Sequence, residues 1–219
     1  MFPIGDENGK RRLWPFMVAA IIAANVFVFY QQILGGEIFI LKWAFVPSRF
    51  GADPAGEAAT LVTAMFMHAG LAHLGGNMLY LWVFGDNIEN RLGHAPFLAF
   101  YFASGLAATM CQYAVNPLSA IPNLGASGAI SGVLGAYLVL FPLARVHILS
   151  PTGVVGVPAY MVLGLWIVMQ LALGYSALSA PGAGEQGGVA YAAHIGGFAA
   201  GLVLAAAFGR RGGARAGAL

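Results

Sequence analysis

One segment of the chain holds residue types that favour nucleophilic chemistry. Residues 125–132 read Gly-Ala-Ser-Gly-Ala-Ile-Ser-Gly, so two hydroxyls, Ser127 and Ser131, lie among tiny residues at the start of an apolar run. A second apolar run downstream contains His194, flanked by alanine and glycine. Small residues let two membrane helices approach closely, and a serine hydroxyl needs a base such as a neutral imidazole within reach. We therefore predict that Ser127 and His194 form a catalytic pair.

Two alternatives concern the same residues. Ser131 lies one helical turn after Ser127 on the same face, so residue types alone allow either hydroxyl to attack. Ser127 is favoured because it lies nearer the start of its segment, where free backbone N–H groups can stabilise an oxyanion. The other alternative is structural, with both hydroxyls bonded to carbonyl groups and Gly128, Gly132 and Gly135 forming a packing stripe. An ionisable residue inside a span favours a functional reading.

A second polar cluster contains His68, His73 and Asn77. His73 and Asn77 are four residues apart and share a helical face. An amide N–H is a suitable donor to an oxyanion, so we expect Asn77 and His68 to supply oxyanion or water contacts. His73 is expected to be structural. The His-Glu-x-x-His run typical of zinc proteases does not occur in the sequence, and we expect neither a metal nor a cofactor.

The composition indicates the elements that must position these residues. Charged residues make up 8% and hydrophobic residues 59% of the chain, and the mean hydropathy is +0.78. A soluble domain has roughly 25% charged residues, so we predict an all-α, polytopic membrane protein in a lipid bilayer. The net charge of +2 gives no reason to expect nucleic acid as a partner. Six apolar segments have about the 20 residues that a span needs: 13–34, 59–84, 96–115, 124–143, 157–178 and 189–208.

The basic residues predict the orientation, because loops rich in Lys and Arg stay in the cytoplasm. With the N-terminus inside, only Lys42 and Arg49 face out. The cations on the cytoplasmic side are then Lys10, Arg11, Arg12, Arg91, Arg145, Arg210, Arg211 and Arg215. We expect a multi-pass protein of a bacterial-type inner or plasma membrane with both termini cytoplasmic. Its parts are an N-terminal segment 1–12, a six-span domain 13–208 and a tail 209–219.

Four motifs in this order resemble those of the rhomboid intramembrane serine proteases. Gly125-Ala126-Ser127-Gly128 is similar to the nucleophile motif of that family. Ala193-His194-Ile195-Gly196-Gly197 with Gly201 is similar to its last-span motif. The spacing His68-x4-His73-x3-Asn77 matches its second-span signature, and Glu89-x-Arg91-Leu92-Gly93 follows that span.

The resemblance implies a six-helix bundle in which Ser127 begins a short fourth helix below the outer surface, with Gly125 and Gly128 beside it. It implies cleavage of single-span membrane proteins near the outer end of their transmembrane segment. It also implies that His194 is the general base, that His68 and Asn77 line the oxyanion region and that His73 is structural.

Two departures from the family pattern bear on this expectation. The outer loop lacks a Trp-Arg pair, and Ser131 stands where some members have an aromatic residue that stacks on the base histidine. We therefore expect His194 either to be held less firmly or to be oriented by another residue. The alternatives to a protease are an inactive rhomboid-like chaperone or adaptor that binds helices, and a small-solute transporter. The intact Ser127, His194 and Asn77 argue against the first, and the lack of a clear internal repeat argues against the second.

Overall fold

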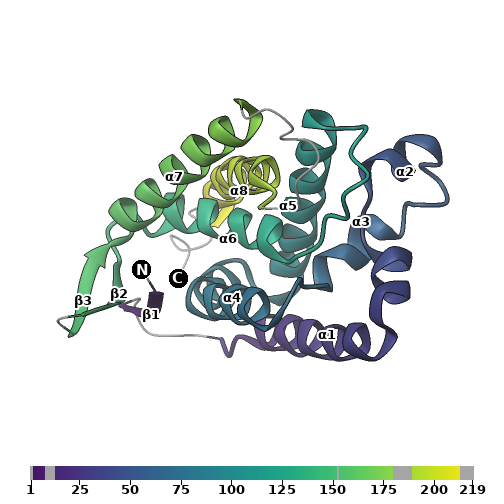
Figure 1. The fold of residues 1–219 in the computed structure, drawn as a ribbon. Coiled ribbons are helices and arrows are strands. Elements are labelled where there is room, and N and C mark those ends of the chain that lie inside the picture. The colour runs from purple at the N-terminus through teal and green to yellow at the C-terminus, as the bar shows by residue number, and fades with distance from the viewer. Residues whose placement is uncertain (1, 8–12, 152, 180–188, 213–219) are drawn as a thin grey trace.

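The computed structural model describes residues 2–7, 13–151, 153–179 and 189–212, and helices dominate it (Figure 1). The long helices are α1 (Phe16–Trp43), α4 (Leu71–Leu92), α5 (His94–Val115), α6 (Ser127–Leu140), α7 (Ala159–Ser179) and α8 (Tyr191–Gly212). The shorter elements are α2 (Pro47–Ala52), α3 (Thr60–Thr63), the 3₁₀ helix η1 (Ala64–Phe66) and the strands β1 (Phe2–Glu7), β2 (Arg145–Ser150) and β3 (Gly153–Pro158).

The six long helices fall on the six predicted apolar segments, so the predicted helical membrane fold is confirmed in class. By length and apolar composition, α1, α5 and α7 can cross a membrane, while α6 and the first part of α8 are shorter apolar helices. α4 ends in a polar stretch that contains Asp86, Asn87 and Glu89, which lowers its hydropathy. The count of six spans therefore stays a prediction.

The predicted span 59–84 is not one helix. The chain forms α3 and η1 and then an extended link, with Met67 at ψ 153°, before α4 begins at Leu71. Gly70, just ahead of α4, accepts the first backbone bond of that helix, from Leu74 at 3.0 Å. This break sets His68 apart from the helix that contains His73 and Asn77.

Helix α8 packs between α5, α6 and α7, and α1 packs mainly against α4 (Figure 1). Glycines make the closest approach possible. A Cβ atom on Gly197 would lie 2.0 Å from the carbonyl oxygen of Gly128, and one on Gly201 would lie 1.9 Å from that of Gly132. Both distances are far below van der Waals contact. The backbones of α6 and α8 can therefore approach this closely only because Gly197 and Gly201 have no side chains. The predicted glycine stripe of α6 is thus a packing surface for α8.

A three-stranded antiparallel sheet closes one end of the bundle and was not predicted. Strand β2 lies between β1 and β3. The side chain of Asp6 ties β1 to the helices, because its Oδ2 accepts hydrogen bonds from Asn87 Nδ2 and from Tyr137 Oη, each at 2.6 Å. Part of the predicted N-terminal segment 1–12 is therefore built into the fold.

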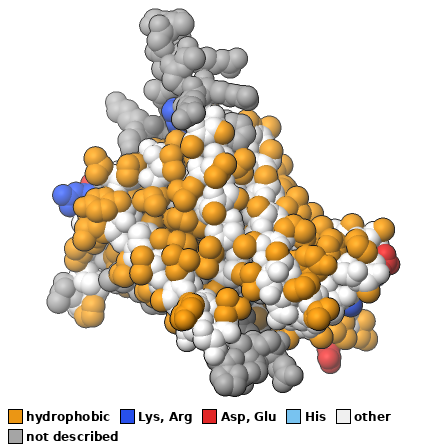
Figure 2. All heavy atoms as spheres, turned by 90° about the horizontal axis from the view of Figure 1, so that it is seen from above, with side chains coloured by type: hydrophobic (Ala, Val, Ile, Leu, Met, Phe, Trp, Pro, Cys, Tyr) orange, Lys and Arg blue, Asp and Glu red, His pale blue; other side chains and the backbone are white. Residues whose placement is uncertain are grey.

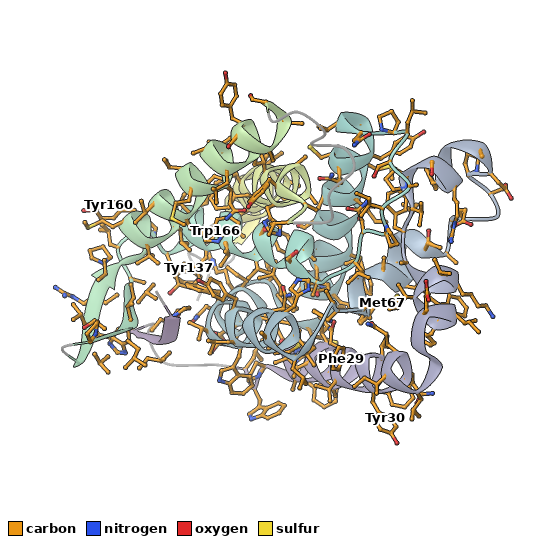
Figure 3. All side chains as sticks on the ribbon, viewed as in Figure 1. Phe29, Tyr30, Met67, Tyr137, Tyr160 and Trp166 are labelled. Atoms are coloured by element: carbon orange, nitrogen blue, oxygen red, sulfur yellow. The ribbon has the colours of Figure 1, made fainter. Side chains whose placement is uncertain are left out.

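The outer surface has the character expected in a bilayer. Figure 2 shows a face covered mainly by hydrophobic side chains, with the visible charges near its periphery. Large apolar side chains such as Ile38 and Leu178 are well exposed, and Tyr30 and Tyr160 point away from the bundle (Figure 3). These features support a membrane protein.

The predicted orientation stays a prediction. Helix α8 runs to Gly212, past the predicted start of the tail at residue 209. The terminal basic side chains on which the orientation depends, Lys10, Arg11, Arg12, Arg210, Arg211 and Arg215, lie outside the part of the chain whose side chains the structure describes.

Candidate active site

Ser127 is the first residue of α6, and its hydroxyl meets an imidazole from α8. The distance from Ser127 Oγ to His194 Nε2 is 2.8 Å, which is normal for a hydrogen bond. The first N–H groups of a helix have no partner within the helix, so this serine lies where backbone donors are available.

The other ring nitrogen of His194 has a partner on α7. Nδ1 lies 2.7 Å from Oε1 of Gln170, and an amide oxygen only accepts hydrogen bonds. With the amide oxygen facing it, Nδ1–H donates a hydrogen bond to Gln170, and Nε2 of the neutral ring is then free to accept the proton of Ser127. This tautomer is the one that a general base at Ser127 requires.

A tryptophan covers the same ring. The centroids of Trp166 and His194 are 6.0 Å apart, and the two rings are tilted by 35°. Trp166 points from α7 into the space beside α8 (Figure 3). It lies four residues before Gln170, so the two side chains share one face of α7. Helix α7 thus supplies two side chains that contact His194.

These groups line a cavity of about 750 Å³, large enough for a peptide segment together with water molecules of roughly 30 Å³ each. Its walls come from α4, the loop 121–124, α6, α7 and the start of α8. Polar groups on the wall include His73, Asn77, Asn123, Ser127 and His194. Most of the remaining wall is apolar, so the nucleophile lies in a pocket suited to a hydrophobic substrate.

His73 and Asn77 face Ser127 across this cavity. Asn77 Nδ2 donates one hydrogen bond to the carbonyl of His73 at 2.9 Å and has a second N–H to offer. The backbone N–H of Ala69 points at His73 Nδ1 at 3.4 Å, which leaves Nε2 as the protonated nitrogen of that ring. A carbon atom added to Gly125 would lie 3.2 Å from His73 Nε2 and 3.6 Å from Ser127 Oγ. His73 Cε1 would lie 3.0 Å from the same atom, so His73 and Ser127 approach each other closely beside Gly125.

His68 lies directly behind His73, with the two ring centroids 5.1 Å apart, and neither of its buried ring nitrogens has a hydrogen-bond partner among the described residues. Its side chain is fully buried, and it is not part of the cavity wall. Gln32 of α1 holds its backbone from both sides, accepting from the N–H at 3.1 Å and donating to the carbonyl at 2.7 Å. The structure therefore places His73 on the cavity wall and His68 behind it, while the oxyanion or water contacts expected of His68 stay a prediction. The break before α4 is the physical reason for this placement, because it takes His68 off the helical face that His73 and Asn77 share.

The remaining predicted residues have local roles. Ser131 Oγ donates to the carbonyl of Ser127 at 2.6 Å, and its residue is 1% exposed, so its hydroxyl is engaged within the helix. Gly125 has a φ of 135°, which side chains rarely allow. A Cβ on Gly128 would lie 2.6 Å from that of Ala108. The two glycines therefore shape the turn before Ser127 and the packing behind it.

Gln170 is the site residue that the sequence analysis missed. It is the one amide side chain of α7, and it lies on the buried stripe of that helix with Leu163 and Gly174. A lone polar residue on the packed face of an apolar span was the signal, because buried amides need a partner. Gln112 of α5 also contacts the site region, accepting from the backbone N–H of Ala193 at 3.2 Å.

Comparison with known proteins gives a consistent picture. The family model of the Rhomboid domain matches residues 55–211, more than half of the chain. Rhomboid protease GluP of Bacillus subtilis is 32% identical over 214 residues, covering 94% of this chain and 38% of that protein.

Two further relatives are similar. Rhomboid protein 1, mitochondrial, of Saccharomyces cerevisiae is 31% identical over 192 residues, covering 85% of this chain and 51% of the relative. The putative rhomboid protease YdcA of Bacillus subtilis is 39% identical over 128 residues, covering 58% and 63%. The chain therefore spans between about two fifths and two thirds of the length of these three relatives.

Proposed function

Because this chain belongs to the rhomboid family, we propose that it is an intramembrane serine endopeptidase with Ser127 as nucleophile and His194 as general base. The observation that carries the proposal is the 2.8 Å distance between Ser127 Oγ and His194 Nε2. Two of the relatives are named as rhomboid proteases, one of them as putative, which supports a protease activity here.

The proposed reaction proceeds in two halves. Ser127 Oγ attacks the carbonyl carbon of the scissile peptide bond while its proton moves to His194 Nε2. His194 then gives that proton to the leaving amine, the C–N bond breaks and an acyl ester remains on Ser127. A water molecule in the cavity attacks the ester with His194 again as base, which releases the carboxylic acid and restores the serine.

The negative charge on the carbonyl oxygen needs donors during both halves. The candidates are the free N–H of Asn77 Nδ2, the Nε2–H of His73 and the N–H groups in the first turn of α6. The space beside Gly125 is within contact distance of both His73 and Ser127, which supports an oxyanion position there. Removing one such donor lowers kcat by about 10²–10³ in known serine proteases. We assign His73, which lines the cavity, to this role beside Asn77, and the role predicted for His68, which packs against His73, stays a prediction.

The cavity and the lipid-facing surface favour a membrane-protein substrate. A transmembrane segment hides its peptide bonds in helical hydrogen bonds, so it must unwind before Ser127 can reach it. We propose that single-span proteins are cut near the outer end of their spans. This follows from the predicted orientation, in which α6 and α8 enter from the outer side with Ser127 and His194 near their starts.

The test is cleavage of a model single-span substrate by purified protein in liposomes. We expect wild type and Ser131→Ala to cleave at the same bond, and Ser127→Ala and His194→Ala to be inactive. Cleavage by Ser127→Ala would refute the assignment of the nucleophile. If wild type cuts none of several substrates while still binding them, the function is that of a helix-binding adaptor.

A further inference from the structure

Gln170 on α7 is a buried amide that contacts the base histidine and takes no part in the bond changes described above. We propose that Gln170 is a positioning residue for the base, fixing His194 as the tautomer that can accept the proton of Ser127. This inference rests on the proposed protease function and adds a third residue, on a third helix, to the Ser127 and His194 pair.

Gln170 lies on the buried face of α7. The buried residues of this helix are Ala159, Leu163, Gln170 and Gly174, which lie four, seven and four residues apart and so form one stripe along the helix. Gln170 is 8% exposed. An amide at such a position costs free energy unless it is bonded, and the bond it makes is the one to His194. The bond to His194 therefore explains why an amide occupies this buried position of α7.

The contacts of the His194 ring determine how freely it can turn. α6 supplies one contact, the Ser127 hydroxyl at Nε2, and its next turn offers no further side-chain bond because Ser131 donates to the Ser127 carbonyl. α7 supplies the other two contacts, the Trp166 ring on one face and the Gln170 oxygen at Nδ1. Without the Gln170 oxygen, nothing described at Nδ1 distinguishes the two neutral tautomers.

The groups around His194 determine the electrostatics of its ring. The titratable groups on the cavity wall besides His194 are His73 and Tyr80, both from α4. α5 presents the neutral amide of Gln112, which bonds the Ala193 N–H. The described wall thus contains no carboxylate or cation. An amide oxygen at Nδ1 orients the ring and leaves it neutral, whereas a carboxylate at the same place stabilises the imidazolium.

This difference provides the test, which measures kcat and KM from pH 5 to pH 9 in liposomes. For Gln170→Leu, which keeps the bulk and removes the acceptor, we expect kcat to fall about tenfold, as for the loss of one hydrogen bond, with KM little changed. For Gln170→Glu we expect kcat to be retained at alkaline pH. Its acid limb shifts to higher pH, because the carboxylate holds the proton on His194 until the pH is higher.

Two control variants separate positioning from packing. Met169→Leu changes the neighbouring residue on the lipid-facing side of α7, where Met169 is 48% exposed, and should match wild type throughout. Gln32→Leu removes a buried amide bonded to the His68 backbone, and should lower thermal stability without moving the acid limb. A merely structural Gln170 would behave like Gln32, with lower stability and an unmoved limb in Gln170→Glu.

A second readout needs no turnover. In ¹⁵N NMR of histidine-labelled protein, assigned with His194→Ala, we expect the Nδ1–H tautomer in wild type and a tautomer mixture in Gln170→Leu. Wild-type kinetics in Gln170→Leu, or an unmoved acid limb in Gln170→Glu, would overturn the inference while leaving the proposed protease intact. Absence of cleavage by wild type would instead refute the proposed function, and the NMR result would still decide whether Gln170 sets the tautomer.

Discussion

Gly197→Ala is expected to abolish most activity through a shift of about one ångström. The Cβ atom would lie 2.0 Å from the carbonyl oxygen of Gly128, and 3.0 Å is the shortest separation that real Cβ atoms show. The obstructing atom belongs to the backbone of α6, so the two helices must separate by roughly 1 Å at this point. Gly128 is next to Ser127, and His194 lies three residues before Gly197.

The same separation acts on the proposed catalytic hydrogen bond. The 2.8 Å distance from Ser127 Oγ to His194 Nε2 would lengthen to nearly 4 Å, beyond the range of about 3.2 Å in which a hydrogen bond is effective. Misplacement by 1 Å costs about 10²-fold in rate, and overpacking costs about 1–3 kcal/mol of stability. We therefore expect Gly197→Ala to lose about 10²-fold in kcat.

The assay compares this variant with Gly164→Ala on α7. A Cβ on Gly164 would have nothing within 4 Å, and alanine in a helix is more favourable than glycine by about 1 kcal/mol. Gly164→Ala should therefore cleave the model substrate like wild type and unfold at an equal or higher temperature. A Gly197→Ala protein with wild-type cleavage and stability would refute the reasoning from helix contact.

Three further substitutions test other parts of the account. Glu89 is fully buried and accepts a hydrogen bond from the N–H of Val18 at 2.8 Å, at the start of α1. Glu89→Gln should therefore lower the free energy of unfolding by about 1–3 kcal/mol. Thermal unfolding in detergent measures this, and unchanged stability would contradict it. Asn77→Ala should lower kcat about 10²-fold or more with KM little changed, and a change confined to KM would argue against an oxyanion role. Tyr137→Phe removes the hydroxyl bonded to Asp6 and should cost about 1 kcal/mol of stability with normal cleavage, whereas a large loss of activity would show that β1 acts on the site.

Periodicity and composition predicted the helical segments because lipid exposure demands long apolar runs with satisfied backbones. The same reasoning missed the sheet at the end of the bundle. Strand β1 is held by Asp6, whose partners Asn87 and Tyr137 lie more than 80 residues away along the chain. Local propensity contains no information on contacts at that distance. The break before α4 was not predicted either, because the apolar run continues through the change of backbone direction.

The site shows the same division between local and distant information. Ser127 could be predicted near the start of a helix because it lies near the start of an apolar run, and His194 could be singled out because an imidazole in an apolar span is unusual. The positions of His68 and His73 relative to the cavity could not be predicted, because they depend on where α4 begins. The contact between Gln170 and His194 could not be predicted, because it depends on how the buried stripe of α7 packs against α8.

The central claim is that Ser127 is a nucleophile activated by His194. The most direct measurement is labelling of the intact protein with a fluorophosphonate, followed by mass-spectrometric mapping of the adduct. The account predicts a single adduct on Ser127 in wild type and in Ser131→Ala, and none in His194→Ala. Labelling of Ser131, or of Ser127 at an undiminished rate in His194→Ala, would contradict it.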